Sequence, residues 1–239
     1  MTACLFDLDG VLTQTALVHN AAWKQTFDAF LQTWSAQHGQ PFVPFDSGPD
    51  YHLYVDGRPR ADGVRTFLSS RGITLPEGTP DDGPDAETVN GLGNRKNDLV
   101  LQKIAEGAVQ VYPGSVDYLH AVKDAGLRRA VVSASANCAD VLRAAGIADL
   151  LEVRVDGVVA RTQHLPGKPA PDTFLYGAEL LHTPPENCAV FEDALAGVEA
   201  GRAGKFGIVV GVDRVGQADA LLAHGADIVV QDLSELLTR

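Results

Sequence analysis

The chain of 239 residues is predicted to be an α/β protein in which a helical cap is inserted into a doubly wound parallel-sheet core. From residue 109 onward, short Val- and Ile-rich stretches alternate with helical patterns, which favours a parallel sheet with helices on both faces. A further buried strand lies far away, at residues 4–8, and joins that sheet only if the residues between are an insertion. The core is therefore expected at 1–15 and 109–239, and the cap at 16–108.

The elements of the cap follow from apolar spacing. The first strand ends at the turn signal Asp9-Gly10, and a long amphipathic helix follows at about residues 16–38. Residues 39–57 are rich in proline, glycine and aromatic residues, so we expect a looped segment whose aromatic side chains pack the insertion. Helical patterns return at about 62–70 and 86–105, separated by an acidic exposed loop.

The core elements alternate. Helices are expected at 115–125, 138–145, 171–182, 195–203 and 217–224. Strands are expected at 129–133, 188–192, 206–211 and 227–230, with a β-like stretch at 153–159.

Composition excludes several classes of protein. Hydrophobic residues make up 45% and charged residues 21%, which excludes wholesale disorder. The net charge of −12, with no basic patch, disfavours nucleic acid as a partner. No apolar stretch approaches the ~18 residues of a membrane span. The first apolar stretch contains two carboxylates and follows no basic segment, so it is not expected to be a signal peptide. Three widely spaced cysteines indicate a reducing, cytoplasmic location.

Polar residues form four clusters in the predicted core. All four are predicted to lie at strand ends: Asp7 and Asp9, Ser133 to Ser135, Lys168-Pro169, and Glu192-Asp193. Ligands bind outside the carboxyl ends of the strands in open α/β sheets, so these clusters are expected to meet. In a strand, Asp7 and Asp9 would share one face, and carboxylates so close together call for a cation between them.

The combined set suits phosphoryl transfer. Converging carboxylates suggest Mg²⁺, a hydroxyl and a lysine can hold an anion, and Asp7 is free to attack as a nucleophile. Each piece alone has a plainer interpretation. Glu192-Asp193 would cap the helix at 195–203, Ser133 would be a turn residue, and Lys168 a solvated loop charge. Their shared placement at strand ends favours the catalytic interpretation.

These segments resemble the motifs of the haloacid dehalogenase (HAD) superfamily, namely FDLDGVL at 6–12, VVSAS at 131–135, GKPAPD at 167–172 and VFEDALAGVEAGRAG at 190–204. The resemblance implies a Rossmann-like core and an aspartyl-phosphate intermediate on Asp7. It implies an acid/base role for Asp9, whose backbone carbonyl also binds Mg²⁺. It further implies phosphate contacts from Ser133 and Lys168, with Asp193 and Glu192 in the metal shell.

Within that superfamily the chain is similar to the β-phosphoglucomutase subfamily. The similarity covers the hinge and first cap helix at 13–23, the cap segment 95–98, the return at 111–114, and the loop SASANC at 133–138. It implies a set of substrate-binding residues: Thr15, His19, Trp23, Gly57, Arg58, Arg60, Ser135, Ala136 and Asn137. Arg60 would clamp the non-transferring phosphate, and His19 would couple cap closure to the protonation of Asp9. Trp23 is expected to pack in the cap core rather than to stack on sugar.

The implied activity is the interconversion of β-D-glucose 1-phosphate and glucose 6-phosphate through a bisphosphate, by a monomeric enzyme acting on a small phosphorylated sugar. The alternative is a Mg²⁺-dependent sugar-phosphate phosphatase, because the mutases usually carry lysine where Asp56 and Ala136 stand. A catalytically silent binding protein is the third hypothesis. It is disfavoured by the intact set of Asp7, Asp9, Lys168 and Asp193.

Overall fold

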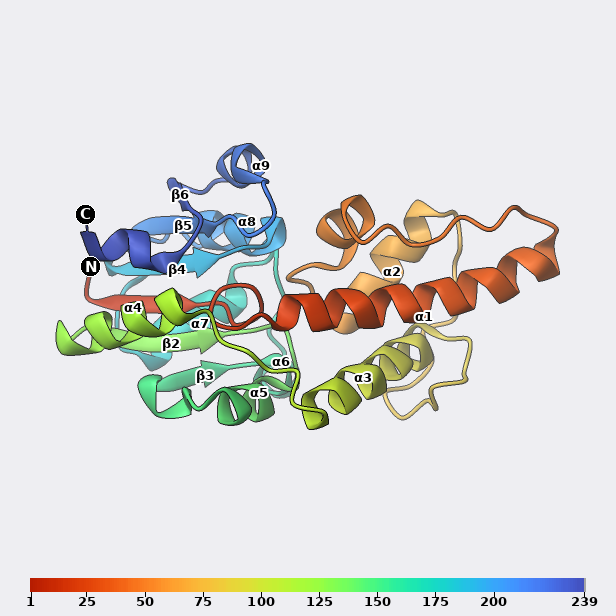
Figure 1. Cartoon of the computed structure of the whole chain (residues 1–239), viewed down its shortest axis with the longest axis horizontal. Helices are drawn as coiled ribbons and strands as arrows, with labels where there is room; N and C mark the ends of the chain where they lie inside the picture. The colour runs from red at the N-terminus through yellow and green to blue at the C-terminus, as the bar shows by residue number, and fades with distance from the viewer. Residues whose placement is uncertain (239) are drawn as a thin grey trace. The chain divides into compact units, whose positions relative to one another are not determined.

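The computed structural model describes residues 1–238, and the chain divides into two compact units (Figure 1). The first unit comprises Met1–Thr15, Gly57–Pro59 and Val109–Arg239. The second comprises Ala16–Asp56 and Arg60–Ala108. The short segment Gly57–Pro59 thus groups with the sheet-containing unit, although the residues on both sides of it belong to the other.

The first unit is built on a six-stranded parallel sheet of order β3-β2-β1-β4-β5-β6. Its strands are β1 (Ala3–Phe6), β2 (Arg128–Val132), β3 (Val153–Val155), β4 (Cys188–Glu192), β5 (Ile208–Val212) and β6 (Ile228–Val230). The amino-terminal strand β1 lies between β2 and β4, with Leu5 opposite Ala130 and Val190. The prediction that the first strand joins the later sheet is confirmed.

Helices cover both faces of this sheet. They are α4 (Pro113–Asp124), α5 (Cys138–Ala145), α6 (Gly157–Thr162), α7 (Asp172–Leu180), α8 (Leu195–Ala203) and α9 (Ala218–Ala223). Successive strand residues point to opposite faces, so Leu5 packs with Phe174 of α7 and Val198 of α8. Its neighbour Phe6 stacks on Phe191 at 4.6 Å between ring centres, and Tyr118 of α4 meets both rings edge-on. The predicted doubly wound core is therefore observed.

Two predictions about strands were wrong. The strand β1 ends at Phe6, so Asp7 and Asp9 lie in the following loop and do not share a strand face. Leu8 made the strand look longer in the sequence, because it is apolar and fully buried although it lies in the loop. Its carbonyl accepts hydrogen bonds from the backbone N–H groups of Leu12 and Thr13.

The β-like stretch expected at 153–159 is a three-residue strand followed by the helix α6. The carboxylate of Asp156 accepts hydrogen bonds from the backbone of Val158 and Val159 and so begins that helix. Val158 is 44% exposed, so its β-branched side chain does not mark a buried strand here.

The second unit is helical and has its own core. Its elements are α1 (Thr15–His38), the π-helical turn η1 (Tyr51–Val55), α2 (Arg60–Ser70) and α3 (Val89–Ala105). Trp23 is buried and stacks on Phe27, as the amphipathic pattern predicted. Phe45 and Tyr51 are also buried here, whereas Phe42 is 45% exposed and does not contribute to the packing.

The segment predicted as a loop at 39–57 therefore contains one helical turn. Tyr51 and Val55 are four residues apart and both buried, and the Tyr51 hydroxyl donates to the carbonyl of Ala16 at 3.3 Å. The helix α3 begins three residues later than expected, because the hydroxyl of Thr88 caps it by accepting from the backbone of Gly91.

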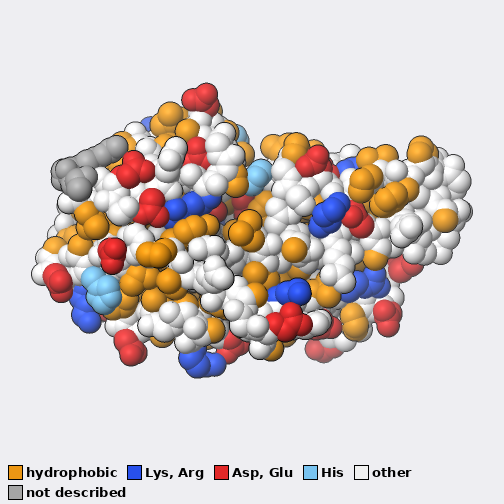
Figure 2. Space-filling view, viewed as in Figure 1, with side chains coloured by type: hydrophobic (Ala, Val, Ile, Leu, Met, Phe, Trp, Pro, Cys, Tyr) orange, Lys and Arg blue, Asp and Glu red, His pale blue; other side chains and the backbone are white. Residues whose placement is uncertain are grey.

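On the face shown in Figure 2, lysine and arginine side chains lie scattered among acidic ones and form no continuous basic patch. Within residues 1–238, no helix is long and apolar enough to cross a membrane.

Candidate active site

The loop after β1 presents Asp7 to the side chain of Lys168. The backbone N–H of Asp7 donates to the carbonyl of Phe191 on β4, which fixes the residue at the carboxyl edge of the sheet. Its Oδ1 lies 2.5 Å from Nζ of Lys168, and Oε1 of Glu192 lies at the same distance from that nitrogen. The ammonium also donates to the carbonyl of Val132 at 2.9 Å. Lys168 is only 2% exposed, so it is not the solvated loop charge of the plainer interpretation.

Burial governs the ionisation of this group of side chains. It raises the pKa of Asp7 well above the ordinary value; the Lys168 ammonium opposes this, while Glu192 and Asp9 reinforce it. Burial also favours neutral Lys168, but the charges of Asp7 and Glu192 outweigh that effect and hold the pKa of Lys168 above its usual range. The single ammonium of Lys168 thus pairs with two buried carboxylates. Because the carboxylates outnumber the ammonium, a further cation would be stabilised here.

Three buried acids supply a donor set for a cation. Oxygen atoms of Asp7, Glu192 and Asp193 all lie within 4.8 Å of one another. Carboxylate oxygens are the ligands that hard divalent cations prefer, and a cation there would offset the surplus negative charge. The residues present therefore fit a Mg²⁺-type ion.

The helix-cap interpretation of Glu192 does not account for its position. Glu192 is the last residue of β4, is fully buried and faces Lys168. The N-cap position of α8 is Ala194, whose methyl side chain forms no capping hydrogen bond. The Oε2 of Glu192 does accept from the backbone of Ala194, but at 3.3 Å.

Asp9 is held by two hydroxyl groups. Thr15 donates to its Oδ1 through a short hydrogen bond, and Ser133 donates to its Oδ2 at 3.3 Å. The hydroxyl of Thr15 also lies 2.6 Å from that of Thr13, which in turn donates to the carbonyl of Leu8. These contacts fix the direction of the Asp9 carboxylate, as a group that exchanges protons at a defined atom requires.

The loop Ser133 to Asn137, after β2, is folded by its own hydroxyls. Ser133 accepts from the backbone of Ser135, and Ser135 accepts from that of Asn137. The backbone of Gly157 donates to the carbonyl of Ser135, and a Cβ on Gly157 would come within 2.8 Å of the Ala134 carbonyl. Ala136 contributes no charge to this loop.

The segment carrying Gly57 and Arg58 packs close to the motif loops of the first unit. Gly57 has φ +68°, and a Cβ there would lie 2.8 Å from Cβ of Ala194, next to Asp193. Pro59 packs on Gly167, where an added Cβ would meet the proline ring at 2.1 Å. Arg58 stands between these two contacts in the sequence, which places it near the loops that carry Lys168 and Asp193.

The other substrate-binding residues expected from the sequence lie in the second unit. His19 and Trp23 are on α1, and Arg60 begins α2, where it donates to Oδ1 of Asn94 at 3.1 Å. The structure therefore brings Asp7, Asp9, Ser133, Lys168, Glu192 and Asp193 together in one unit, and places His19, Trp23 and Arg60 in the other.

Sequence reasoning missed Lys96 of α3 as an individual residue. Its Nζ lies 2.6 Å from Nδ1 of His19 and 4.8 Å from the centre of the Trp23 ring, and the residue is only 5% exposed. A lysine in a polar run at 95–98 is usually solvated, so no local pattern signals its burial. The available signal was its place in a segment that resembles the last cap helix of the mutases.

Comparison with known proteins agrees with this geometry. The family model described as haloacid dehalogenase-like hydrolase matches residues 1–205. The chain therefore belongs to the haloacid dehalogenase-like hydrolase family, whose members are enzymes, and the resemblance seen in the motifs is confirmed.

Relatives within that family include β-phosphoglucomutases. One from Mycobacterium tuberculosis (strain CDC 1551 / Oshkosh) is 58% identical over 238 residues, which cover 98% of this chain and 91% of the relative. Another, from Bacillus subtilis, is 31% identical over 99% of this chain and 92% of its own length. The crystal structure of a β-phosphoglucomutase from Clostridium difficile superposes with TM-score 0.77 at 27% identity, covering 99% of this chain and 93% of that one. The predicted fold class and the predicted subfamily are both supported.

Proposed function

We propose that this chain is a Mg²⁺-dependent β-phosphoglucomutase that interconverts β-D-glucose 1-phosphate and glucose 6-phosphate. The observation that carries the choice of substrate is the 58% identity to a β-phosphoglucomutase over almost the whole chain. The contacts of Asp7, Asp9 and Lys168 supply the matching chemistry.

Asp7 is the proposed nucleophile and Asp9 the proposed acid/base. The Asp7 phosphoryl group passes to a sugar hydroxyl oxygen, and Asp9 takes the proton that this oxygen releases, so a sugar bisphosphate forms and Asp7 returns as a carboxylate. After the bisphosphate turns round, Asp7 attacks the other phosphorus and Asp9 returns its proton to the leaving sugar oxygen. The hydroxyls of Thr15 and Ser133 keep Asp9 aimed through both transfers.

Lys168 and Ser133 hold the transferring phosphoryl group in this proposal. The ammonium of Lys168 already lies against Asp7, so it can neutralise an oxygen of a group bound there. Asp7, Asp193, Glu192 and the backbone carbonyl of Asp9 would hold Mg²⁺, which supplies charge neutralisation at the phosphoryl oxygens when bound.

The second phosphate of the substrate is assigned to arginine. Arg60 would clamp that phosphate, because a guanidinium fork suits bidentate contact with phosphate. Arg58 would restore part of the positive charge lost with the lysines missing at Asp56 and Ala136. Support comes from Asp56, which is only 7% exposed and points its carboxylate at His52, 3.4 Å away. Its negative charge is thus engaged within the cap.

The remaining expected site residues complete the proposal. Gly57, Ser135, Ala136 and Asn137 would contact the sugar or its second phosphate. His19, paired with Lys96, would couple cap closure to Asp9, and Trp23 would support that pair from the cap core. We further propose a monomer that acts in the cytoplasm, which size-exclusion chromatography and fractionation test.

A sugar-phosphate phosphatase is the second candidate, because the two missing lysines weaken the expected distal phosphate site. Incubation with β-D-glucose 1-phosphate, Mg²⁺ and a trace of the bisphosphate separates the two. Formation of glucose 6-phosphate in excess of free phosphate supports the mutase, and release of phosphate alone excludes it. Asp7→Asn should abolish either activity, and turnover by that variant would remove Asp7 as the nucleophile.

A further inference from the structure

The loop after β5 belongs to none of the four motifs, yet it is firmly ordered by one side chain. The Oδ1 of Asp213 accepts hydrogen bonds from the backbone N–H groups of Val215, Gly216 and Gln217 at 3.1, 2.7 and 2.8 Å. Its Oδ2 accepts from the backbone of Ala218 at 3.1 Å. The side chains of Arg214 and Gln217 therefore project from a backbone that Asp213 holds in place.

Arg214 reaches across to the loop that carries Asp7 and Asp9. Its Nε donates to the carbonyl of Gly10 at 2.9 Å, and its Nη2 donates to that of Val11 at 3.3 Å. These carbonyls accept from a charged donor, which makes the hydrogen bonds stronger than neutral ones.

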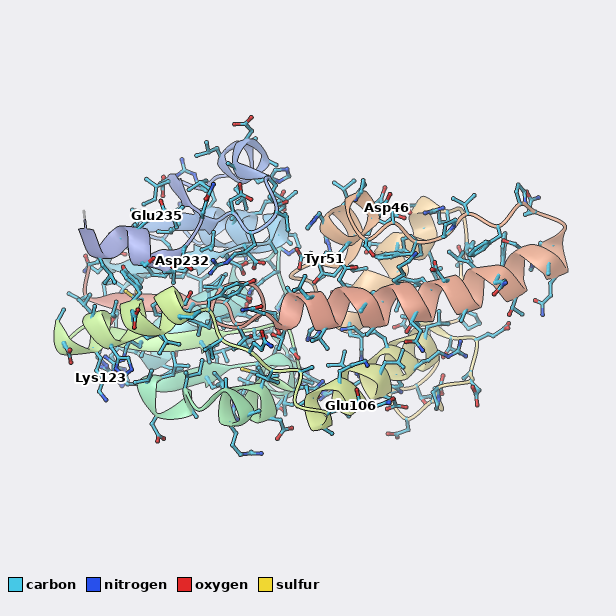
Figure 3. All side chains as sticks on the ribbon, in the orientation of Figure 1. Asp46, Tyr51, Glu106, Lys123, Asp232 and Glu235 are labelled. Atoms are coloured by element: carbon cyan, nitrogen blue, oxygen red, sulfur yellow. The ribbon has the colours of Figure 1, made fainter. Side chains whose placement is uncertain are left out.

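The guanidinium is itself held from other sides. It stacks on the ring of Tyr112, 3.6 Å from the ring centre, and Nη1 pairs with Asp232 at 3.0 Å. Asp232, labelled in Figure 3, lies just after β6. The side chain of Arg214 is only 13% exposed, so this arrangement is a packed one rather than a surface ion pair.

Gly10 is the point at which this contact acts on the acidic cluster. It has φ +99°, and a Cβ added there would lie 1.8 Å from Oδ2 of Asp193. The backbone of Gly10 thus lies directly against the Asp193 carboxylate. By fixing the position of Gly10, Arg214 therefore also limits where the Asp193 carboxylate can lie.

Gln217 contacts the same acid from its backbone side. Its side-chain amide Nε2 donates to the carbonyl of Asp193 at 2.9 Å. One loop, ordered by Asp213, therefore contacts both acid-bearing loops, through Arg214 on one and Gln217 on the other.

We propose that Arg214 and Gln217 are positioning residues that hold the Asp7–Gly10 loop and Asp193 at the spacing a divalent cation requires. This rests on the proposed function in one respect, since Asp193 is taken there as a metal ligand. Groups that orient metal ligands without touching the metal commonly affect metal affinity or activity by about 10- to 100-fold when replaced.

The test measures Mg²⁺ affinity on the folded protein without substrate, from the rise of the melting temperature with Mg²⁺ concentration. We expect Gln217→Leu and Arg214→Gln each to weaken the apparent affinity by about 10-fold or more. Arg214→Lys keeps the charge but not the fork, and should recover part of the loss. Circular dichroism establishes that each variant is folded.

Matched controls are Gln163→Leu and Arg202→Gln, since Gln163 is exposed and the Arg202 side chain is 66% exposed. In turnover assays, kcat should fall in the loop variants while KM for the sugar phosphate changes little, because neither residue is placed against the sugar. Unchanged Mg²⁺ affinity in a folded Gln217→Leu, or equal losses in the controls, would overturn the proposal. If the wild type fails to form glucose 6-phosphate, the proposed function fails while the affinity measurement still decides this inference.

Discussion

The ammonium of Lys168 lies 2.5 Å from the carboxylate of Asp7, and both side chains are buried. Replacing the lysine by methionine keeps an unbranched side chain that is one atom shorter, but removes the ammonium that Asp7 and Glu192 share. Removal of one partner from a buried ion pair costs about 3–5 kcal/mol of stability. We expect Lys168→Met to lower the free energy of unfolding by that amount in denaturant titrations without Mg²⁺, and to recover part of it when Mg²⁺ is added.

Lys123→Met is the matched control for that change. Lys123, labelled in Figure 3, lies in the last turn of α4 on the surface of the same unit. Its replacement should change stability by no more than about 0.5 kcal/mol. Equal effects of the two substitutions would show that the buried ion pair does not stabilise this fold.

The hydroxyl of Thr15 is expected to matter for catalysis through Asp9. Thr15→Val keeps the shape of the side chain but removes the donor to Oδ1 of Asp9. A positioned acid/base contributes about 10²- to 10⁴-fold to a rate, so we expect loss of its orientation to lower kcat by about 10-fold or more. Steady-state kinetics of sugar-phosphate turnover measure the effect, with Thr15→Ser as the variant that restores the hydroxyl. Similar kcat values for the Val and Ser variants would exclude this role.

Much of the fold could be predicted because each of its signals is local. Buried parallel strands read as short Val- and Ile-rich runs, and the carboxyl ends of such strands meet at one edge. The sequence therefore predicted that Asp7 and Glu192 would lie close together. The prediction that Lys168 follows a strand was wrong, because it lies in the connection between α6 and α7 and reaches Asp7 from there. The predicted end of the first strand was wrong, because Leu8 is fully buried but lies beyond β1. An apolar residue can be buried without pairing in the sheet, and the sequence pattern does not distinguish the two cases.

Other features depend on tertiary contacts that no local pattern contains. Lys96 is buried because His19 and Trp23, 77 and 73 residues earlier, surround its ammonium. Arg214 and Gln217 follow a predicted strand, but a single arginine after a strand is usually a solvated charge. Their partners Gly10 and Asp193 are far away in the sequence, so only the assembled sheet reveals the contacts.

The stability of the first unit should depend on pH through Asp213. Burial raises the pKa of this carboxyl, but hydrogen bonds from the backbone of residues 215–218 outweigh that effect and hold it below the ordinary 3.8. Because the pKa is lower in the folded state, the carboxylate stabilises the fold at any pH above its pKa in the unfolded chain. This stabilisation is lost as the pH falls through the pKa of the folded state. Asp213→Asn should therefore lower the free energy of unfolding at pH 7 by about 1 kcal/mol.

The difference between wild type and Asp213→Asn should shrink below the ordinary pKa of 3.8, where the wild-type carboxyl becomes protonated. Urea titrations of both proteins between neutral pH and the acid limit of folding measure it. Two stability curves that stay parallel over that range would show that the charge on Asp213 is not what orders the loop.

Because Gly10 lies so close to Asp193, replacing it should destabilise the protein in two ways, through backbone strain and through a clash with the Asp193 carboxylate. Gly10→Ala places a methyl group in the left-handed region and also against Oδ2 of Asp193, 1.8 Å away if nothing moves. Gly146→Ala, in the same unit, meets only the first cost, because Gly146 has φ +69° and a Cβ there has no atom within 4 Å. The conformational cost alone is about 1–2 kcal/mol. Gly10→Ala should exceed it in unfolding experiments and should also weaken Mg²⁺ binding, whereas Gly146→Ala should leave Mg²⁺ binding unchanged. Equal destabilisation with intact Mg²⁺ affinity in both variants would mean that the Asp193 carboxylate moves aside freely and that its position is not set by the Gly10 loop.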